Sequence, residues 1–137
     1  MSQECTLTVT SKSLGKKTEK ILVVDDEQGW RDLLTFELGE LGYEIMTAKN
    51  GPTGLEILRQ GSFDLMITDV RMPGSLDGID LVETYRQENP TQKAIFITGY
   101  ATEEKLERAL NSKFSFCLKK PFPQEDLAKM ISQILAL

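Results

Sequence analysis

Three acidic residues stand where two short apolar runs of the sequence end. Asp25 and Asp26 follow the run at 21–24, and Asp69 follows the run at 65–68. A short apolar run followed by a turn signal is typical of a buried strand in a parallel sheet. Open α/β sheets bind their ligands in the crevice beyond the carboxyl ends of such strands. If the two strands are neighbours, the three carboxylates converge and repel one another unless a cation lies among them. The sequence therefore indicates a metal-dependent site.

A hydroxyl and an ammonium group follow two further apolar runs in the same way. Thr98 comes directly after 94–97, and Lys120 comes directly after 116–119. A divalent cation and Lys120 together neutralise the formal charge of the three carboxylates. An aspartate in such a set can attack phosphorus and form an aspartyl phosphate. The metal, the ammonium and the hydroxyl can hold the phosphoryl oxygens, so this set of side chains favours phosphoryl transfer.

Each of these residues also has an ordinary interpretation when it is taken alone. Asp25 and Asp26 could be turn residues or a helix N-cap after a strand, and Thr98 could be a capping hydroxyl. A lysine such as Lys120 is most often a solvated surface residue. A functional site is favoured because all of these residues are expected at one edge of the same sheet, which their separate ordinary roles would not explain.

The elements that must position these residues alternate between strand and helix. Apolar runs and amphipathic periods predict strands at 21–24, 44–48, 64–68, 94–97 and 115–118, and helices at about 28–40, 52–60, 78–88, 103–111 and 127–135. Such alternation implies right-handed crossovers, with helices on both faces of one parallel sheet. We predict a doubly wound, flavodoxin-like α/β fold with five strands in the order 2-1-3-4-5. In that order the first and third strands are adjacent, which brings Asp25, Asp26 and Asp69 together.

Several residues are expected to shape the helices. An apolar stripe on the first helix comprises Trp30, Leu33, Leu34, Leu38 and Leu41. Gly42 suits the position just after that helix, and Thr102 suits the cap of the helix at 103–111. Asn50-Gly51 indicates a turn, and Leu55 and Leu58 are expected to be buried on the helix that follows.

Composition limits the class of protein. The chain has 137 residues, enough for one domain, which we place at 20–137 after a flexible tail at 1–19. The net charge is -5, with +2 in residues 1–20 and -7 in the remainder, which argues against nucleic-acid binding. No apolar stretch is long enough to span a membrane. Two cysteines form no disulfide framework and favour a reducing, cytoplasmic setting.

The chain contains no histidine. This excludes histidine-ligated zinc, a Ser–His or Cys–His catalytic pair, and a histidine phosphoacceptor. Carboxylate oxygens remain as ligands, and they suit Mg2+, Ca2+ or Mn2+.

Taken together, the motifs resemble the receiver domain of two-component response regulators. The matching segments are ILVVDDE, DLMITDVRMPGSLDG, AIFITGYA and LKKPF, and the similarity extends over about residues 20–136. The resemblance implies that Asp69 is the phosphoacceptor. It also implies that Asp26 binds Mg2+ directly, that Asp25 acts through metal-bound water, and that the backbone carbonyl of Arg71 reaches the metal.

The resemblance assigns the remaining site residues as well. Thr98 matches the hydroxyl that follows the phosphoryl group when the domain switches, and Lys120 matches the lysine that pairs with the phosphate. The family typically has a cis peptide at this lysine, so Lys120–Pro121 is expected to be cis. The implied donor is a sensor histidine kinase or a phosphotransfer protein, and the implied output is a switch in conformation that signals to a partner.

Three features depart from the family pattern. The loop MPGSLDG is one residue longer than the commonest form. Cys117 stands where an aromatic residue often changes rotamer on activation, and the neighbouring Phe116 is expected to face the other side of the sheet. Arg71 and Tyr100 border the expected path of the attacking water, and their size favours slow dephosphorylation.

The sequence fits four possible functions to different degrees. A turnover phosphatase usually has a second acid two residues after its nucleophile, where this chain has Arg71. A flavin carrier needs a phosphate loop after the first strand, and the acidic DDEQGW repels phosphate. The expectation is a stand-alone receiver, monomeric or dimeric on phosphorylation, that binds neither DNA nor membrane itself. Because Cys117 replaces the aromatic, the alternative of a degenerate receiver that acts only through protein contacts stays open.

Overall fold

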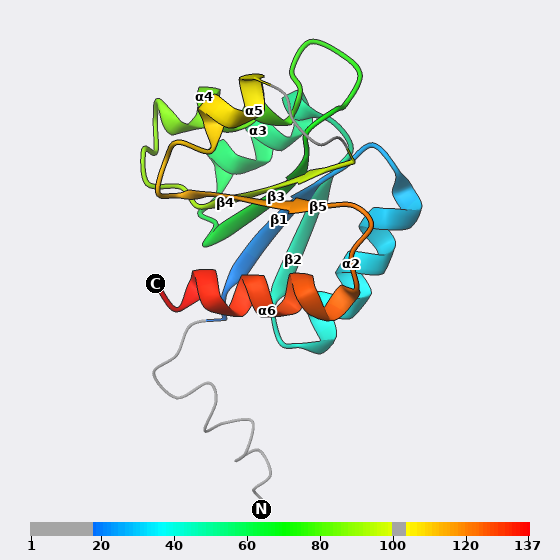
Figure 1. Ribbon diagram of the computed structural model, residues 1–137. Helices are drawn as coiled ribbons and strands as arrows, with labels where there is room; N and C mark the ends of the chain where they lie inside the picture. Colours follow the sequence, from blue (N-terminus) through cyan, green and yellow to red (C-terminus); the bar gives the residue numbers. More distant parts are fainter. Residues whose placement is uncertain (1–17, 100–103) are drawn as a thin grey trace, which may run out of the picture.

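The computed structural model describes residues 18–99 and 104–137, which form one sheet with helices on both faces (Figure 1). The strands are β1 (Lys20–Val24), β2 (Glu44–Ala48), β3 (Leu65–Asp69), β4 (Ala94–Thr98) and β5 (Ser115–Lys119). The helices are α2 (Gln28–Glu40), α3 (Gly51–Gln60), α4 (Gly78–Arg86), α5 (Glu104–Ala109) and α6 (Gln124–Leu135).

The sheet is parallel and has the predicted order β2-β1-β3-β4-β5. Val24 at the end of β1 pairs with Thr68 in β3, so both strands stop at the same edge. β3 and β4 each end one residue later than predicted, at Asp69 and Thr98. The two residues are therefore the last of their strands rather than the first of the following loops.

Two hydrophobic cores fill the space between the sheet and the helices. Alternate residues of β1 enter opposite cores: Leu22 packs with α3, α4 and α5, whereas Ile21 packs with α2 and α6. Figure 1 shows these two helical layers on either side of the sheet. The central strands are buried on both faces, and this is why they appear in the sequence as unbroken apolar runs.

The apolar stripe of α2 is only partly buried. Leu34 and Leu38 are fully enclosed and Trp30 is partly buried, but Leu33 and Leu41 are 38% and 54% exposed. The prediction of one continuous buried stripe was wrong for these two leucines: within the described part of the chain they stay exposed, and Leu41 lines a groove together with Ala128 of α6.

Helix ends largely follow the expected chemistry. Gly42 has φ 99° just after α2, where the N–H groups of Gly42 and Tyr43 donate to Gly39 and Leu38, a Schellman arrangement. Asn50 is the N-cap of α3, since its side-chain oxygen accepts from the Thr53 N–H at 2.8 Å. The Asn50-Gly51 signal thus marks a helix start rather than a separate turn.

Other expectations have varied outcomes. Leu58 is buried as predicted, whereas Leu55 is only partly buried. The Lys120–Pro121 peptide is cis, as expected. The tail at 1–17, Tyr100 and the proposed cap Thr102 lie outside the described residues. In the part of the chain that is described, no helix combines the length and the apolar character needed to cross a membrane.

Candidate phosphoryl-transfer site

The carboxylates of Asp25, Asp26 and Asp69 come together at the carboxyl edge of the sheet. One oxygen of each lies within 4.8 Å of the others. The pairing of β1 with β3 produces this convergence, because Asp25 and Asp26 follow β1 directly and Asp69 ends β3. Asp25 is buried, Asp69 is partly buried and Asp26 is exposed, so the cluster opens to solvent on the Asp26 side.

Asp25 is a buried acid with incomplete hydrogen bonding. Its Oδ1 accepts the Glu27 N–H at 2.9 Å, but its Oδ2 has no partner among the described residues. The pKa of Asp25 is raised to about 6, mainly by burial; the negative charge of Asp69 acts in the same direction, and the Glu27 N–H opposes both. A buried oxygen without a partner costs free energy. A hard cation, or water bound to it, would satisfy this oxygen, so the acidic cluster fits a Mg2+ site.

The carboxyl group of Asp69 is also held above its ordinary pKa. Burial is the main cause, and the positive charge of Lys120 opposes it. The charge of Asp26 raises the pKa, whereas the backbone N–H groups of Arg71 and Val70 lower it. A carboxyl group in a cleft whose pKa is raised by burial and altered by specific charged neighbours is a candidate for a functional site.

Thr98 and Lys120 share a cleft with Asp69. The cleft measures about 320 Å³ and is lined by Asp26, Glu27, Asp69, Arg71, Thr98, Gly99 and Lys120. Thr98 is 3% exposed, and its backbone oxygen accepts the Lys120 N–H at 2.7 Å. The ends of β4 and β5 are thereby joined, and the structure brings together all the residues that the sequence placed at this edge.

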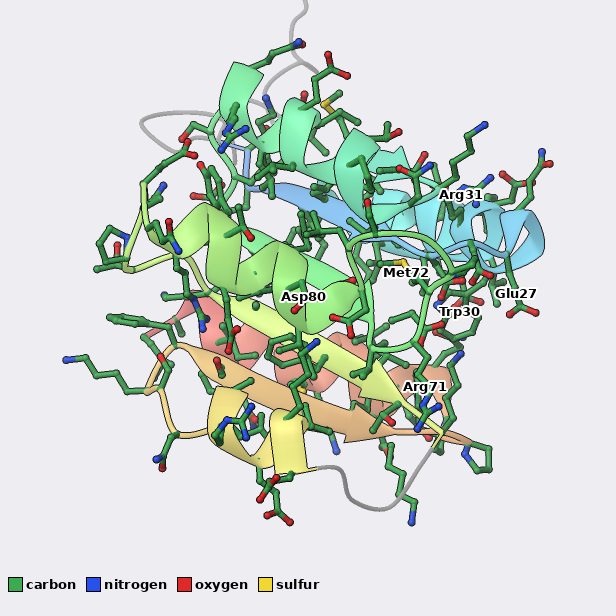
Figure 2. The ribbon with its side chains drawn as sticks, turned by 90° about the horizontal axis from the view of Figure 1, so that it is seen from above. Glu27, Trp30, Arg31, Arg71, Met72 and Asp80 are labelled. Carbon is green, nitrogen blue, oxygen red and sulfur yellow. The ribbon has the colours of Figure 1, made fainter. Side chains whose placement is uncertain are left out.

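Arg71 lies in the loop that leaves β3, and its side chain is exposed at the rim of the cleft. Figure 2, viewed from above, shows Glu27, Trp30, Arg71 and Met72 on the same side of the molecule, with Asp80 apart from them on α4. The roles of the Arg71 carbonyl in metal binding and of its side chain in phosphoryl lifetime stay predictions.

Gly78 supports the site and was not identified from the sequence. A Cβ at this position would lie 2.0 Å from the backbone oxygen of Asp69 and 2.9 Å from Oγ1 of Thr68. The Gly78 N–H donates to the Val70 oxygen at 3.0 Å. The start of α4 therefore packs directly on the backbone of the central aspartate. The Asp77-Gly78 pair was the available signal, since Asp77 caps α4 through its 2.8 Å contact with the Asp80 N–H.

A second contact was also missed, between Lys120 and an aromatic ring. The ammonium nitrogen of Lys120 lies 5.5 Å from the centroid of the Trp30 ring. Trp30 in turn packs edge-on against Phe122, with centroids 5.8 Å apart. The sequence indicated only that Trp30 belongs to the apolar stripe of α2.

Cys117 and Phe116 face opposite sides of the sheet, as expected. Cys117 packs against the core that contains α3, α4 and α5, and Phe116 packs against the other. Burial raises the pKa of the Cys117 thiol and thereby favours its neutral, protonated form. Phe116 therefore does not take the place of the aromatic that the family often has here.

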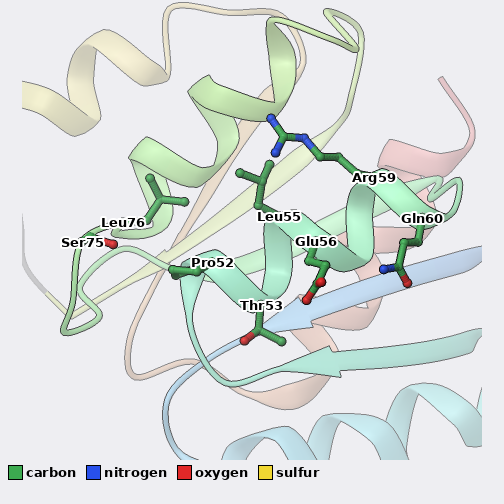
Figure 3. Close-up of a pocket in the computed structure, with 8 residues that line it drawn as sticks. All are labelled: Pro52, Thr53, Leu55, Glu56, Arg59, Gln60, Ser75 and Leu76. Carbon is green, nitrogen blue, oxygen red and sulfur yellow. The ribbon is translucent and has the colours of Figure 1, made fainter.

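A wider cavity of about 590 Å³ lies away from the acidic cluster (Figure 3). It is formed by α3 and the loop after β3, with Leu55 and Leu76 as its apolar walls and Arg59 at its edge. The Arg59 side chain is bonded to Glu88. This cavity contains none of the residues that the sequence marked for chemistry, so size does not identify the reactive cleft.

Comparison with known proteins gives a consistent result. A family model described as the response regulator receiver domain matches residues 21–132. The Escherichia coli sensor histidine kinase RcsC is 41% identical over 101 residues, which are 74% of this chain and 10% of that protein. The chain thus spans about a tenth of that relative's length.

Two further proteins match nearly from end to end. An uncharacterized 14.6-kDa protein of Leptolyngbya boryana is 37% identical over 115 residues, or 82% of this chain and 87% of that one. The structure of Thermotoga maritima response regulator TrrA, in complex with Mg(2+)-BeF, has a TM-score of 0.76 at 33% identity. That match covers 85% of this chain and 99% of TrrA.

Proposed function

This chain belongs to the family of response regulator receiver domains, and from that premise we propose that it accepts a phosphoryl group on Asp69. The observation that supports the proposal most directly is the convergence of Asp25, Asp26 and Asp69 within 4.8 Å, with Thr98 and Lys120 on the same cleft. Receiver domains are signalling modules rather than turnover enzymes. The covalent adduct on Asp69 is therefore the signal itself.

Mg2+ would be held by Asp26 and Asp69, by Asp25 through water, and by the carbonyl of Arg71. When bound, the cation supplies positive charge that offsets repulsion within the acidic cluster and on the incoming phosphoryl group. The unpartnered Oδ2 of Asp25 supports this assignment. The related TrrA is in complex with Mg(2+)-BeF, which supports Mg2+ as the cation.

In the proposed reaction, Asp69 is the nucleophile, and Lys120 and Thr98 bind the phosphoryl group. An Asp69 carboxylate oxygen forms the new bond to phosphorus, and the bond from phosphorus to the donor's histidine nitrogen breaks. That nitrogen keeps the electron pair and takes a proton from solvent. Lys120 and Thr98 hold phosphoryl oxygens, and the hydroxyl of Thr98 follows the new group so that the switch in conformation spreads from β4.

The donor would be a sensor histidine kinase or a phosphotransfer protein, in the cytoplasm. The acidic composition supports protein rather than DNA as the output partner. Whether phosphorylation converts a monomer into a dimer is part of the same proposal and is measured by sedimentation with and without a phosphoryl mimic.

A degenerate receiver, acting only through protein contacts, is the second candidate. Cys117 favours it, because this residue stands where the family often has the switching aromatic. The two candidates differ in one respect: a degenerate receiver needs no adduct on Asp69.

The test incubates the protein with Mg2+ and acetyl phosphate and measures intact mass. We expect one added phosphoryl group on the wild type and none on Asp69→Asn. Asp126→Asn is the matched control, since this exposed acid lies on α6 outside the cleft. A wild type that gains no mass, or an Asp69→Asn variant labelled as strongly as the wild type, would reject phosphoryl transfer to Asp69.

A further inference from the structure

Lys120 has two kinds of neighbour, the acidic cluster and an indole ring. Its ammonium lies 5.5 Å from the Trp30 centroid, within the range of about 6 Å over which an aromatic face attracts a cation. The same side chain lines the cleft that contains Asp69. Lys120 therefore stands between the ring and the proposed phosphoacceptor.

The ring itself is held in place. Trp30 is partly buried against the core of α2 and α6, and it packs at 79° against Phe122. Phe122 follows Lys120 by two residues, and the backbone of Lys120 is bonded to Thr98. The short segment 120–122 thus supplies both the ring that packs against Trp30 and the backbone from which the lysine side chain extends.

The remaining freedom of Lys120 lies in its side chain. A lysine ammonium is a point charge on a flexible four-carbon stem, and only a narrow range of stem conformations reaches a given phosphoryl oxygen. A group that is positioned before the reaction lowers the activation barrier, because its conformational entropy is already lost before the chemical step.

We propose that Trp30 is a positioning residue for phosphoryl transfer, whose ring holds the ammonium of Lys120 at the cleft before the donor arrives. The inference rests on the proposed transfer to Asp69 and adds a residue to it. The competing explanation is that Trp30 only packs against Phe122 and supports the fold. The two differ because packing alone does not depend on the charge of Lys120.

The first measurement is the rate of Asp69 phosphorylation by acetyl phosphate at saturating Mg2+. Trp30→Leu keeps apolar volume without a ring, and Trp30→Phe keeps a ring of weaker attraction. We expect Trp30→Leu to be about two- to five-fold slower than the wild type, the factor that an exposed cation–π contact gives. Trp30→Phe is expected to fall between the two.

The second measurement repeats Trp30→Leu in a Lys120→Met background. If the ring acts through the ammonium, Trp30→Leu causes no further loss once the charge is gone. An equal fractional loss in both backgrounds would overturn the inference and assign Trp30 a packing role. Equal rates for Trp30→Leu and the wild type would overturn it as well.

A matched control lies at the opposite end of β5. Lys113 is 5.4 Å from the centroid of Phe114, a contact of the same type that is remote from the cleft. Phe114→Leu is expected to leave the phosphorylation rate unchanged. A loss comparable to that of Trp30→Leu would show that removal of any such contact slows the reaction, and would overturn the inference.

The contact also has a readout that needs no phosphoryl donor. Trp30 is the only tryptophan in the chain, so tryptophan fluorescence reports on the surroundings of this one ring, which include the ammonium of Lys120. We expect Lys120→Met to change the emission, whereas Lys113→Met does not. Unchanged emission in Lys120→Met overturns the inference even if Asp69 is phosphorylated. A wild type that takes no phosphoryl group rejects the proposed function, whatever the emission shows.

Discussion

A partly or fully buried charged group lies at each end of the sheet, and the two groups differ in how completely they are hydrogen-bonded. At the amino end, Arg86 donates to the backbone oxygens of Gln92 and Phe114 and to the Ser115 hydroxyl, at 2.8–3.0 Å. At the carboxyl end, Asp25 has one oxygen bonded and the other without a partner among the described residues. Burial lowers the pKa of Arg86 and raises that of Asp25.

This difference separates a group that serves structure from one kept ready for a ligand. A buried charge with its hydrogen bonds satisfied joins the elements around it. A buried acid beside two others raises the free energy of the folded state until a cation arrives. The same sheet therefore has a hydrogen-bonded structural charge at one end and, at the other, an acid whose free energy a bound cation would lower.

The largest expected effect tests how closely the carboxyl end of the sheet is packed where Gly78 meets the Asp69 backbone. Gly78→Ala would place a methyl group 2.0 Å from the Asp69 oxygen, and backbone on both sides must move. We expect a loss of about 3 kcal/mol or more in the free energy of unfolding, measured with urea. Gly39→Ala is the control, because nothing lies within 4 Å of its Cβ, and it should stabilise α2 by about 0.5–1 kcal/mol. Similar values for the two variants would contradict the close packing at Gly78.

The next effect concerns the amino end. Arg86→Met removes the side-chain donor to the Gln92 oxygen and to the Ser115 hydroxyl, and one of the two donors to the Phe114 oxygen, which keeps the Ala94 N–H. We expect a loss of about 2–4 kcal/mol in unfolding free energy. Because the site lies at the other end, the affinity for Mg2+ should be unchanged, as measured by calorimetry. If Arg86→Met keeps full stability but loses Mg2+ affinity, Arg86 serves the metal site rather than the stability of the fold, and the comparison between the two ends is wrong.

Asp25→Asn is expected to have the opposite sign. Removing a charge whose ionisation is disfavoured by burial should stabilise the metal-free protein at pH 7, by about 1–2 kcal/mol after allowance for solvent screening. The same change should remove most of the stabilisation that Mg2+ gives to the wild type. Thermal unfolding with and without Mg2+ measures both. If Asp25→Asn instead destabilises the metal-free protein, the ionised carboxylate of Asp25 contributes to stability through its hydrogen bond and the prediction is wrong.

The smallest effect is a pH dependence. The pKa of Asp25 is about 6 in the folded protein against an ordinary value of 3.8, so its contribution to stability is fully present below the lower value and is lost as pH rises through about 6. Relative to Asp25→Asn, the metal-free wild type should therefore lose about 1 kcal/mol between pH 5 and pH 6. Protons also compete with the metal, so Mg2+ affinity should fall below about pH 6. A difference that is flat across this range would contradict the raised pKa.

The sequence predicted the sheet and the residues at its carboxyl edge because both follow from local signals. A buried parallel strand is an unbroken apolar run, and its last residue lies in the crevice whatever the details of packing. Asp25, Asp69, Thr98 and Lys120 could be placed in this way from the ends of four runs. Their roles in phosphoryl transfer stay predictions.

What the sequence did not predict depends on contacts between distant elements. The period of α2 does not indicate which of its apolar residues a neighbour covers, so Leu33 and Leu41 were assigned with Leu34. The need for Gly78 arises only once α4 reaches the Asp69 backbone. The contact of Trp30 with Lys120 joins a helix near the start of the chain to a loop near its end, and no local pattern encodes it.

The order of the strands has a consequence for partial unfolding. The acidic residues stand at the ends of β1 and β3, which are adjacent, whereas Lys120 follows β5, an edge strand that pairs only with β4 in the described part of the chain. Edge elements open more readily than central ones, as units of their own. Opening of β5 and α6 would remove the lysine and leave the three acids in place. The capacity to hold a cation would then outlast the capacity to respond to phosphate. Bound Mg2+ should slow amide hydrogen exchange in β1 and β3 more than in β5.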